Sequence, residues 1–235
     1  MKKGVFIAGT DTGVGKTTIA AGLARFLKNR GIDVGVMKPV ETGCSCIKEE
    51  LVPRDSLLLK KAAKVEDELN MINPYRFEKP LAPLVAAEME GGEINLRRLK
   101  SCFYNLKKRH QFIIVEGIGG LLVPLTPRVF TFDLIRLFNL PIVMVAKNSL
   151  GTINHTLLSL KWAETHRVEV IGMILNNIME EQGLAEYTNF WALQRLIKIP
   201  ILGVLPYYTY MEEENKIPSL GKLIEENIDL SCILF

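Results

Sequence analysis

Apolar runs alternate with helical patterns along most of this chain. The apolar runs are short, rich in β-branched residues and nearly continuous, which is typical of strands covered by helices on both faces of a sheet. The candidate strands are 4–8, 34–38, 112–116, 141–146, 168–175 and 201–205. The helical patterns lie at about 16–30, 55–64, 95–109, 131–139, 151–165 and 183–197. This alternation predicts an α/β fold, in which right-handed crossovers build a mostly parallel sheet flanked by helices on both faces.

The chain carries no internal repeat, low-complexity tract or linker-like segment. The Pro-containing stretch 72–83 predicts a long loop and not a domain boundary. An α/β sheet protein of 235 residues commonly forms one domain. We therefore expect residues 1–235 to form a single domain.

Residues 9–18 form a Gly-rich turn between the first apolar run and the first helical pattern. This order is the context that a phosphate-binding loop, or P-loop, requires, because backbone N–H groups and the helix dipole then converge on one spot. The strict pattern is G-x4-G-K-[ST], but here Thr10 holds the first Gly position and Gly9 lies one residue further away. The Gly-Lys-Thr triplet and its flanks favour a nucleoside triphosphate site over a fortuitous Gly-rich turn. Lys16 would reach the outer phosphates, and the Thr17 hydroxyl would ligate the Mg²⁺ that bridges them.

Polar or Gly-rich segments follow the candidate strands. After the P-loop they are 38–43, 116–120, 147–155, 176–177 and 206–207. Ligands bind at the carboxyl ends of the strands in open parallel sheets. These segments therefore predict one active-site rim.

Two carboxylates on this rim are candidate magnesium ligands. Glu116 closes an apolar strand, where many P-loop enzymes place a magnesium-binding carboxylate. With Thr17 and Asp55 it could hold the ion, since Mg²⁺ favours a few carboxylates plus phosphate oxygens. The alternatives are a strand-end surface carboxylate for Glu116 and a simple helix N-cap for Asp55.

Lys38 ends a buried strand, where a charge carries a desolvation cost, and Pro39 after it favours a defined position. Lys16 and Lys38 beside a triphosphate suit a reaction that builds negative charge near the γ-phosphate. An ordinary snorkelling lysine is the alternative for Lys38. The turn 151–154 opens a helix and is either a second anion site or a plain glycine turn.

The composition, 48% hydrophobic and 23% charged, is that of a globular protein with a sizeable core. A net charge of +3 is too small to argue for nucleic-acid or membrane-surface binding. The longest apolar runs reach only about half a membrane span, and the N-terminus shows no long apolar signal core. The four cysteines have neither a paired framework nor metal-ligand spacing. We expect free thiols in a reducing cytosol and a cytoplasmic protein.

Taken together and in order, the motifs resemble those of dethiobiotin synthetase. They are the P-loop, Lys38-Pro39-Val40-x-Thr42-Gly43, Asp55, Asn73-Pro74-Tyr75, Val115-Glu116-Gly117-x-Gly119-Gly120, Leu150-Gly151-x-Ile153-Asn154-His155 and Gly203-x-x-Pro206. The resemblance runs from residue 4 to about 208, and the longer P-loop is also the form that this family uses. It implies a homodimeric, Mg²⁺- and ATP-dependent enzyme of biotin synthesis, which closes a cyclic urea from 7,8-diaminopelargonic acid and CO2. In that scheme ATP phosphorylates a carbamate formed on one amine, and the second amine then displaces phosphate.

The resemblance also implies roles for individual residues. Lys16 and Lys38 would be catalytic, and Thr17, Asp55 and Glu116 would hold Mg²⁺. The nucleotide would be bound by Thr12, Gly13, Val14, Gly15, Lys16, Thr17, Thr18, Asp55, Glu116, Gly117, Gly119, Asn176, Asn177, Leu205, Pro206 and Tyr207, with the last five flanking the adenine. The substrate would be bound by Thr12, Lys38, Thr42, Gly119, Leu150, Gly151, Asn154 and Tyr187, with the last four receiving its tail carboxylate across the dimer interface.

Three positions depart from the family pattern. Ile118 replaces a smaller residue, Thr42 stands where some members have Ser, and Asn177 stands where an acidic residue can occur. The last departure leaves the base preference open. After Tyr207 the resemblance becomes loose, and the acidic run 212–214 either touches the ribose or is a solvated charge run.

Two other classes are built on the same P-loop core. A switch ATPase of the partitioning or metal-delivery type acts through nucleotide-driven dimerisation. Many of these carry a further lysine early in the loop, where this chain has Thr10, Asp11 and Thr12. An amide-forming ligase for a large cofactor precursor generally needs a glutamine-hydrolysing domain, and 235 residues leave no room for one.

Overall fold

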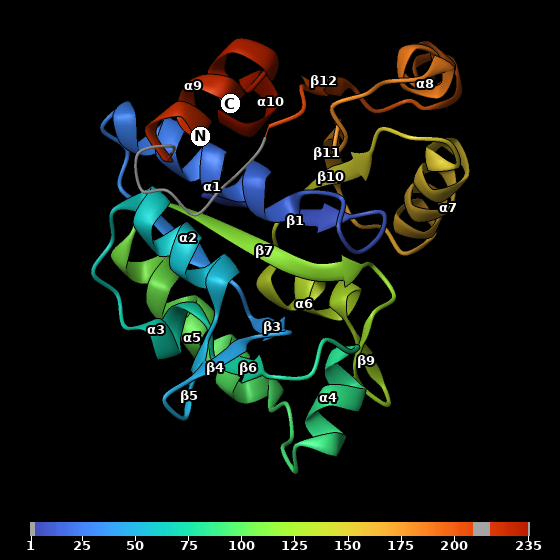
Figure 1. Cartoon of the computed structure of the whole chain (residues 1–235). Helices are drawn as coiled ribbons and strands as arrows, with labels where there is room; N and C mark the ends of the chain where they lie inside the picture. Colours follow the sequence, from blue (N-terminus) through green and yellow to red (C-terminus); the bar gives the residue numbers. More distant parts are fainter. Residues whose placement is uncertain (1–2, 209–216, 235) are drawn as a thin grey trace.

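A six-stranded parallel sheet runs through the centre of the molecule in the order β12–β11–β10–β1–β7–β2 (Figure 1). The computed structural model describes residues 3–208 and 217–234. The strands are β1 (Gly4–Gly9), β2 (Val34–Met37), β7 (Phe112–Gly120), β10 (Ile142–Lys147), β11 (Val170–Asn176) and β12 (Ile201–Leu205). All six predicted strands are present, and β7 runs four residues past its predicted end. The sheet predicted from the alternating pattern is confirmed.

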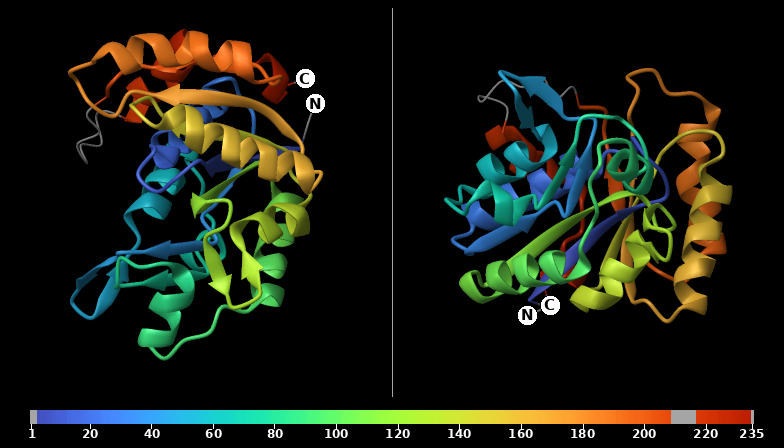
Figure 2. Two further views of the ribbon diagram at one scale, coloured as in Figure 1. Left: turned by 90° about the vertical axis from the view of Figure 1, so that its right-hand side faces the viewer. Right: turned by 90° about the horizontal axis from the view of Figure 1, so that it is seen from below.

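Helices cover both faces of the sheet (Figures 1 and 2). The helices that pack on one face are α1 (Lys16–Asn29), α2 (Arg54–Ala63), α9 (Ile217–Asn227) and α10 (Ser231–Leu234). Those that pack on the other are α5 (Leu96–Arg109), α6 (Thr131–Phe138), α7 (Thr152–Thr165) and α8 (Leu184–Leu196). Two short helices, α3 (Leu69–Ile72) and α4 (Pro83–Met89), lie in the connection between α2 and α5. No helix within the described ranges is long and apolar enough to cross a bilayer.

The strands are mostly apolar because the side chains of each strand pack into two hydrophobic cores, one on each face of the sheet. In β1, Val5 and Ile7 belong to the core beneath α1, whereas Phe6 and Ala8 belong to the core on the opposite face. Successive strand side chains point to opposite faces, so a strand covered on both sides shows no polar alternation. This is why the sequence reads as continuous apolar runs.

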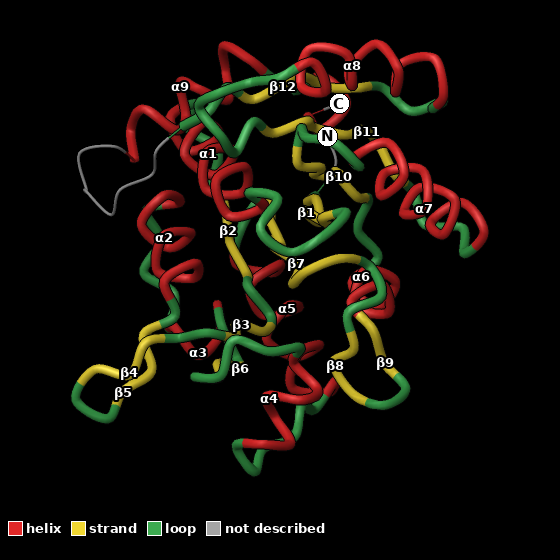
Figure 3. The backbone as a smooth tube through the Cα atoms, turned by 45° about the vertical axis from the view of Figure 1, so that its right-hand side comes forward, coloured by secondary structure: helices red, strands yellow, loops and turns green. Residues whose placement is uncertain are grey.

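Three small two-stranded ribbons lie outside the central sheet (Figure 3). They pair β3 (Val40–Thr42) with β6 (Tyr75–Phe77), β4 (Ser45–Ile47) with β5 (Glu50–Val52), and β8 (Pro124–Thr126) with β9 (Val129–Phe130). The prediction of a loop over the whole of 72–83 was wrong, because β6 lies within it and pairs in parallel with β3. A three-residue strand is too short to show a period of two, and Pro74 and Pro80 on either side of it favour a loop in the sequence.

Candidate active site

The P-loop connects β1 to the first turn of α1, as the sequence predicted. Gly13 and Gly15 adopt left-handed backbone angles, with φ of 71° and 88°. A Cβ on Gly15 would lie 2.0 Å from Nδ2 of Asn176, which donates a hydrogen bond of 3.0 Å to the Val14 carbonyl. Only glycine combines this angle with this close approach. The loop is therefore fixed against the end of β11.

Lys16 is buried at the start of α1. Its Nζ donates to the Asp11 carbonyl at 2.9 Å, so the side chain folds back across the loop. Burial and the nearby Lys38 charge lower the pKa of Lys16 to about 8, despite the opposing effect of Glu116, Asp55 and Asp11. An anion in the loop would therefore meet an ammonium group that is already in place and poorly solvated.

Four predicted residues from four different elements meet beside the loop. Glu116 Oε1 accepts hydrogen bonds from the Thr17 hydroxyl at 2.8 Å and from Lys38 Nζ. Lys38 Nζ also lies 2.9 Å from Asp55 Oδ2 and donates to the Gly117 carbonyl at 3.4 Å. Lys38 follows β2, Asp55 lies in the first turn of α2, Glu116 lies in β7 and Thr17 in α1. Lys38 therefore sits between two carboxylates.

The charges in this cluster depend on one another. Burial alone would lower the pKa of Lys38, but Glu116 and Asp55 outweigh it, and the pKa is raised above the ordinary lysine value. Burial would raise the pKa of Asp55, but Lys38 and Thr17 bring it below its usual value. Burial raises the pKa of Glu116 to about 7, and Asp55 adds to this rise against Lys38. Lys38 thus stays charged, whereas Glu116 titrates near neutrality.

Glu116 is completely buried, and its Oε2 has no hydrogen-bond partner among the described residues. A buried carboxylate oxygen without a partner is costly unless a ligand satisfies it. Together with the Thr17 hydroxyl and the Asp55 carboxylate, it gives a set of oxygen donors. Hard cations such as Mg²⁺ prefer such donors, completed by phosphate oxygens and water. The residues present fit a magnesium ion.

The cluster opens into a cleft of about 340 Å³. Its walls come from the P-loop, the end of β2, β3, α2 and the end of β7. The lining residues are Thr12, Gly13, Gly15, Lys16, Thr17, Thr18, Lys38, Glu41, Thr42, Asp55, Glu116, Ile118 and Gly119. The cleft therefore gathers nearly all the predicted phosphate, metal and inner substrate residues, and Gly119 lies beside the Thr12 hydroxyl.

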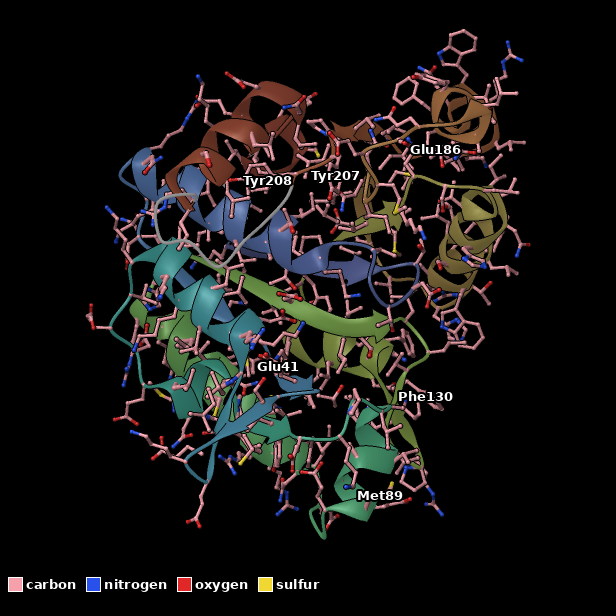
Figure 4. All side chains as sticks on the ribbon, in the orientation of Figure 1. Glu41, Met89, Phe130, Glu186, Tyr207 and Tyr208 are labelled. Atoms are coloured by element: carbon pink, nitrogen blue, oxygen red, sulfur yellow. The ribbon has the colours of Figure 1, made fainter. Side chains whose placement is uncertain are left out.

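The predicted residues that flank the base lie at the ends of β11 and β12. The backbone N–H of Asn177 donates to the Leu205 carbonyl at 3.0 Å, which brings the segment 205–207 beside Asn176 and Asn177. Figure 4 shows Tyr207 on the far side of α1 from Glu41. The acidic run 212–214 lies outside the described residues.

Four predicted substrate residues are not brought into the cleft. Leu150, Gly151 and Asn154 lie at the start of α7, and Tyr187 lies on α8. Leu150 is 90% exposed and Tyr187 65% exposed, and neither lines the cleft. Within one copy of the chain, these residues form a separate exposed group at the sheet edge.

Sequence reasoning missed two sets of buried polar residues. The sequence placed Glu41 only within the rim segment 38–43, whereas in the structure its carboxylate accepts hydrogen bonds from the first turn of α2. Asn148 and Asn189 were not singled out, although Asn148 Nδ2 donates to Asn177 Oδ1 at 2.8 Å and Asn189 Nδ2 donates to Asn148 Oδ1 at 3.0 Å. These amides tie α8 to the ends of β10 and β11. Their sequence separations of 29 and 41 residues left no local signal.

The parallel sheet, the glycine loop and the buried lysines at its carboxyl edge define a P-loop nucleotide-binding protein. Two solved structures show the same fold at 14% identity. One is the MinC:MinD cell division complex of Aquifex aeolicus, with a TM-score of 0.53 over 96% of this chain and 89% of that one. The other is MinD of Pyrococcus horikoshii with Mg-ADP, with a TM-score of 0.51 over 96% and 88%. A family described as an AAA domain matches residues 3–215.

Full-length relatives narrow the class to one family. The chain is 38% identical to the ATP-dependent dethiobiotin synthetase BioD of Thermodesulfovibrio yellowstonii, over 100% of this chain and 99% of the relative. It is 40% identical to BioD of Bacillus licheniformis, over 99% and 96%. The chain belongs to the dethiobiotin synthetase family.

Proposed function

We propose that this protein is an ATP-dependent dethiobiotin synthetase, which closes the ureido ring of dethiobiotin from 7,8-diaminopelargonic acid and CO2. Relatives that match over the whole chain are named ATP-dependent dethiobiotin synthetases. The observation that carries the proposal is the position of Lys38, a buried ammonium beside the P-loop lysine and between two carboxylates. A site that binds and phosphorylates a small anion needs such a fixed positive charge.

ATP would lie along the P-loop with its phosphates toward the cleft. The loop N–H groups, the start of α1 and Lys16 would hold the phosphates, since this arrangement concentrates positive potential at one point. Asn176, Asn177 and the segment 205–207 would flank the base. The Asn176 amide donates its Nδ2 hydrogen to Val14, so its Oδ1 is left to accept a hydrogen bond from the 6-amino group of adenine.

Thr17, Asp55 and Glu116 would hold a magnesium ion between them and the phosphates. The partnerless Glu116 Oε2 supports this assignment, because an ion would satisfy it. Bound there, Mg²⁺ would neutralise charge that develops on the phosphate oxygens. Lys38 would then shift part of its contact from the carboxylates to the incoming substrate anion.

The inner end of the cleft would carry out the chemistry. One substrate amine adds to CO2 and loses a proton, which gives a carbamate held by Lys38, Thr12 and Thr42. A carbamate oxygen attacks the γ-phosphorus, and the bond to ADP breaks. Lys16 and Lys38 stabilise the charge that spreads over the transferring group. The second amine then attacks the carbonyl carbon, loses a proton and expels phosphate, which closes the five-membered urea.

The substrate tail would reach a second copy of the chain. Leu150, Leu184, Tyr187 and Trp191 are large apolar side chains, each at least 65% exposed, at the start of α7 and on α8. Such a patch marks a surface that another protein covers. We propose a homodimer through this face, in which the N-terminus of α7 receives the tail carboxylate from the partner's substrate.

One assay tests the reaction. The purified protein is incubated with ATP, Mg²⁺ and bicarbonate, with and without 7,8-diaminopelargonic acid, while phosphate release is followed and the product is weighed by mass spectrometry. We expect diamine-dependent phosphate release and a product heavier than the diamine by CO less two hydrogens. Hydrolysis that is indifferent to the diamine would contradict the assignment and point to a switch ATPase.

A further inference from the structure

Glu41 is a buried carboxylate whose contacts all go to one helix start. It lies in β3, is only 5% exposed, and both of its oxygens are occupied. Oε1 accepts from the Asp55 backbone N–H at 2.9 Å, and Oε2 accepts from the Ser56 N–H at 3.0 Å and the Ser56 hydroxyl at 2.5 Å. The first turn of α2 is thus bound to β3.

These hydrogen bonds replace a missing helix cap. Pro53 occupies the N-cap position of α2 and offers no side-chain hydrogen bond. The first N–H groups of a helix have no partner within the helix, and a negative charge there also interacts favourably with the helix dipole. Glu41 supplies both from another element. Glu41 therefore fixes the backbone of Asp55 at the start of α2, and with it the direction in which the Asp55 side chain projects from the helix.

Glu41 also links the two groups that meet in the site. Lys38 precedes it by three residues, and the Lys38 carbonyl is held by Asn73 Nδ2 at 2.8 Å. Asp55 is held through its backbone N–H, and its carboxylate lies 2.9 Å from Lys38 Nζ. Residues 38–41 therefore position both side chains of the contact between Lys38 and Asp55.

The charge of Glu41 matters as well as its hydrogen bonds. Burial and the neighbouring Asp55 raise the pKa of Glu41, so a carboxylate is an expensive cap at this position. A serine at position 53 would cap the helix without burying a second acid. Glu41 instead adds to the negative potential around Lys38 and, with Glu116 and Asp55, helps to raise its pKa.

We propose that Glu41 is the positioning residue of the magnesium site: it holds Asp55 in the orientation in which its carboxylate shares the ion with Thr17 and Glu116. This role rests on the magnesium site of the proposed function. Figure 4 shows Glu41, which belongs to β3, near the start of α2. Glu41 contacts the backbone N–H of Asp55 and not its carboxylate, so it acts by fixing the start of the helix from which that carboxylate projects. Loss of an outer group that orients a metal ligand typically costs about 10–100-fold in metal affinity.

The test measures magnesium binding without turnover. Thermal unfolding of the full chain is followed at a fixed ADP concentration while MgCl2 is titrated, and the midpoint of the rise in Tm gives the half-saturating Mg²⁺ concentration. We expect Glu41→Ala to raise this midpoint about tenfold, with the effect of ADP in EDTA unchanged. Asn95→Ala is the matched control, because Asn95 caps α5 with bonds to Arg97 and Arg98 and does not line the cleft.

Milder variants keep the proposal testable if Glu41→Ala fails to fold. Glu41→Gln keeps the size but loses the charge and one acceptor, and Ser56→Ala removes one donor. Both should shift the midpoint in the same direction by about threefold. Diamine-dependent turnover of Glu41→Gln should recover at high Mg²⁺, whereas that of Lys38→Gln should not.

Two results would overturn the proposal. A midpoint that stays at the wild-type value in every variant, while Tm falls as in Asn95→Ala, would make Glu41 only a helix cap. A wild-type protein whose Tm does not respond to Mg²⁺ would remove both the magnesium site and its positioning residue. Failure of the ring-closing reaction shows separately, in the diamine assay on the wild-type protein.

Discussion

The cleft beside the P-loop and the face formed by α7 and α8 differ in how complete they are. In the cleft, Lys16, Lys38 and Glu116 are buried, Lys38 and Glu116 are bonded to each other, and Lys16 is held by the Asp11 carbonyl. On the α7–α8 face, Leu150 and Tyr187 point into solvent and contact none of the reacting groups. Figures 1 and 2 show α7 and α8 together at one end of the sheet.

The difference bears on the proposed homodimer. Phosphate and metal chemistry needs preorganised charge, which one chain can build from its own strand ends. In the proposed homodimer, a substrate held at its far end would need a second wall, and the exposed apolar face would supply one when another copy covers it. Charge changes in the cleft should therefore alter turnover, whereas changes on the face should alter assembly and substrate affinity.

The largest effect is expected for Lys38→Gln. Removing the ammonium that, in the proposed mechanism, faces the carbamate and the γ-phosphate should lower kcat about 10²–10³-fold, measured as diamine-dependent phosphate release. Nucleotide binding, measured by the ADP-dependent rise in Tm, should persist. Lys222→Gln, which removes an exposed lysine of α9 paired with Glu226, is the control and should keep wild-type turnover. A Lys38→Gln enzyme within threefold of the wild type would contradict the assigned role.

The next largest effect is expected for Trp191→Asp on α8. An acid in place of this exposed aromatic side chain of the proposed interface should weaken self-association about 100-fold, measured by analytical ultracentrifugation. It should also raise KM for the diamine while ADP binding stays unchanged. Ile47→Asp changes an apolar residue of β4 that is also exposed, far from this face, and should have neither effect. A monomeric wild-type protein with full activity would break the comparison.

A pH experiment probes the burial of Glu116. Its pKa is raised from 4.5 to about 7, so the folded protein binds more protons than the unfolded chain between these values. Stability from this group is present below pH 4.5 and is lost as the pH rises toward 7. We expect the free energy of unfolding, measured in urea, to fall between pH 5 and 7.5 by about 2 kcal/mol more in the wild type than in Glu116→Gln.

Two other groups bear on that pH experiment. Burial also raises the pKa of Glu41, which adds to the fall in both proteins and cancels in the difference between them. The pKa of Lys16 is lowered to about 8, so the titration of Lys16 changes the free energy of unfolding only above that pH. Equal slopes for the wild type and Glu116→Gln would show that Glu116 remains ionised in the folded state throughout this range.

The smallest effect is expected at the contact between the two regions. Asn189 donates to Asn148 and to the Ser149 carbonyl, and Asn148 in turn holds Asn177. Asn189→Ala should destabilise the protein by about 1 kcal/mol, because one buried and one half-buried acceptor lose a donor. KM for ATP should change less than twofold. A large change in KM would show that the α8 face and the base site are coupled through these amides.

The sequence predicted the sheet and most of the cleft because their signals are local. The glycine loop lies between a strand and a helix, and Lys38 and Glu116 each end an apolar strand, so the rule that ligands bind at strand ends places them together. Glu41 escaped detection because its partners follow 14 and 15 residues later, across the β4–β5 hairpin. The exposure of Tyr187 also could not be predicted. The sequence of its 13-residue helix does not show whether an aromatic side chain faces the core or the solvent.

The strand order has a consequence for how the chain acquires its structure during synthesis. β1 lies in the middle of the sheet, yet its neighbours β7 and β10 begin about 100 and 130 residues after it ends. A ribosome that adds 5–20 residues per second needs about 5–20 seconds to go from the end of β1 to the start of β7. During that delay β1 lacks both of its sheet neighbours, and its apolar residues Val5, Phe6 and Ile7, buried in the folded protein, stay exposed.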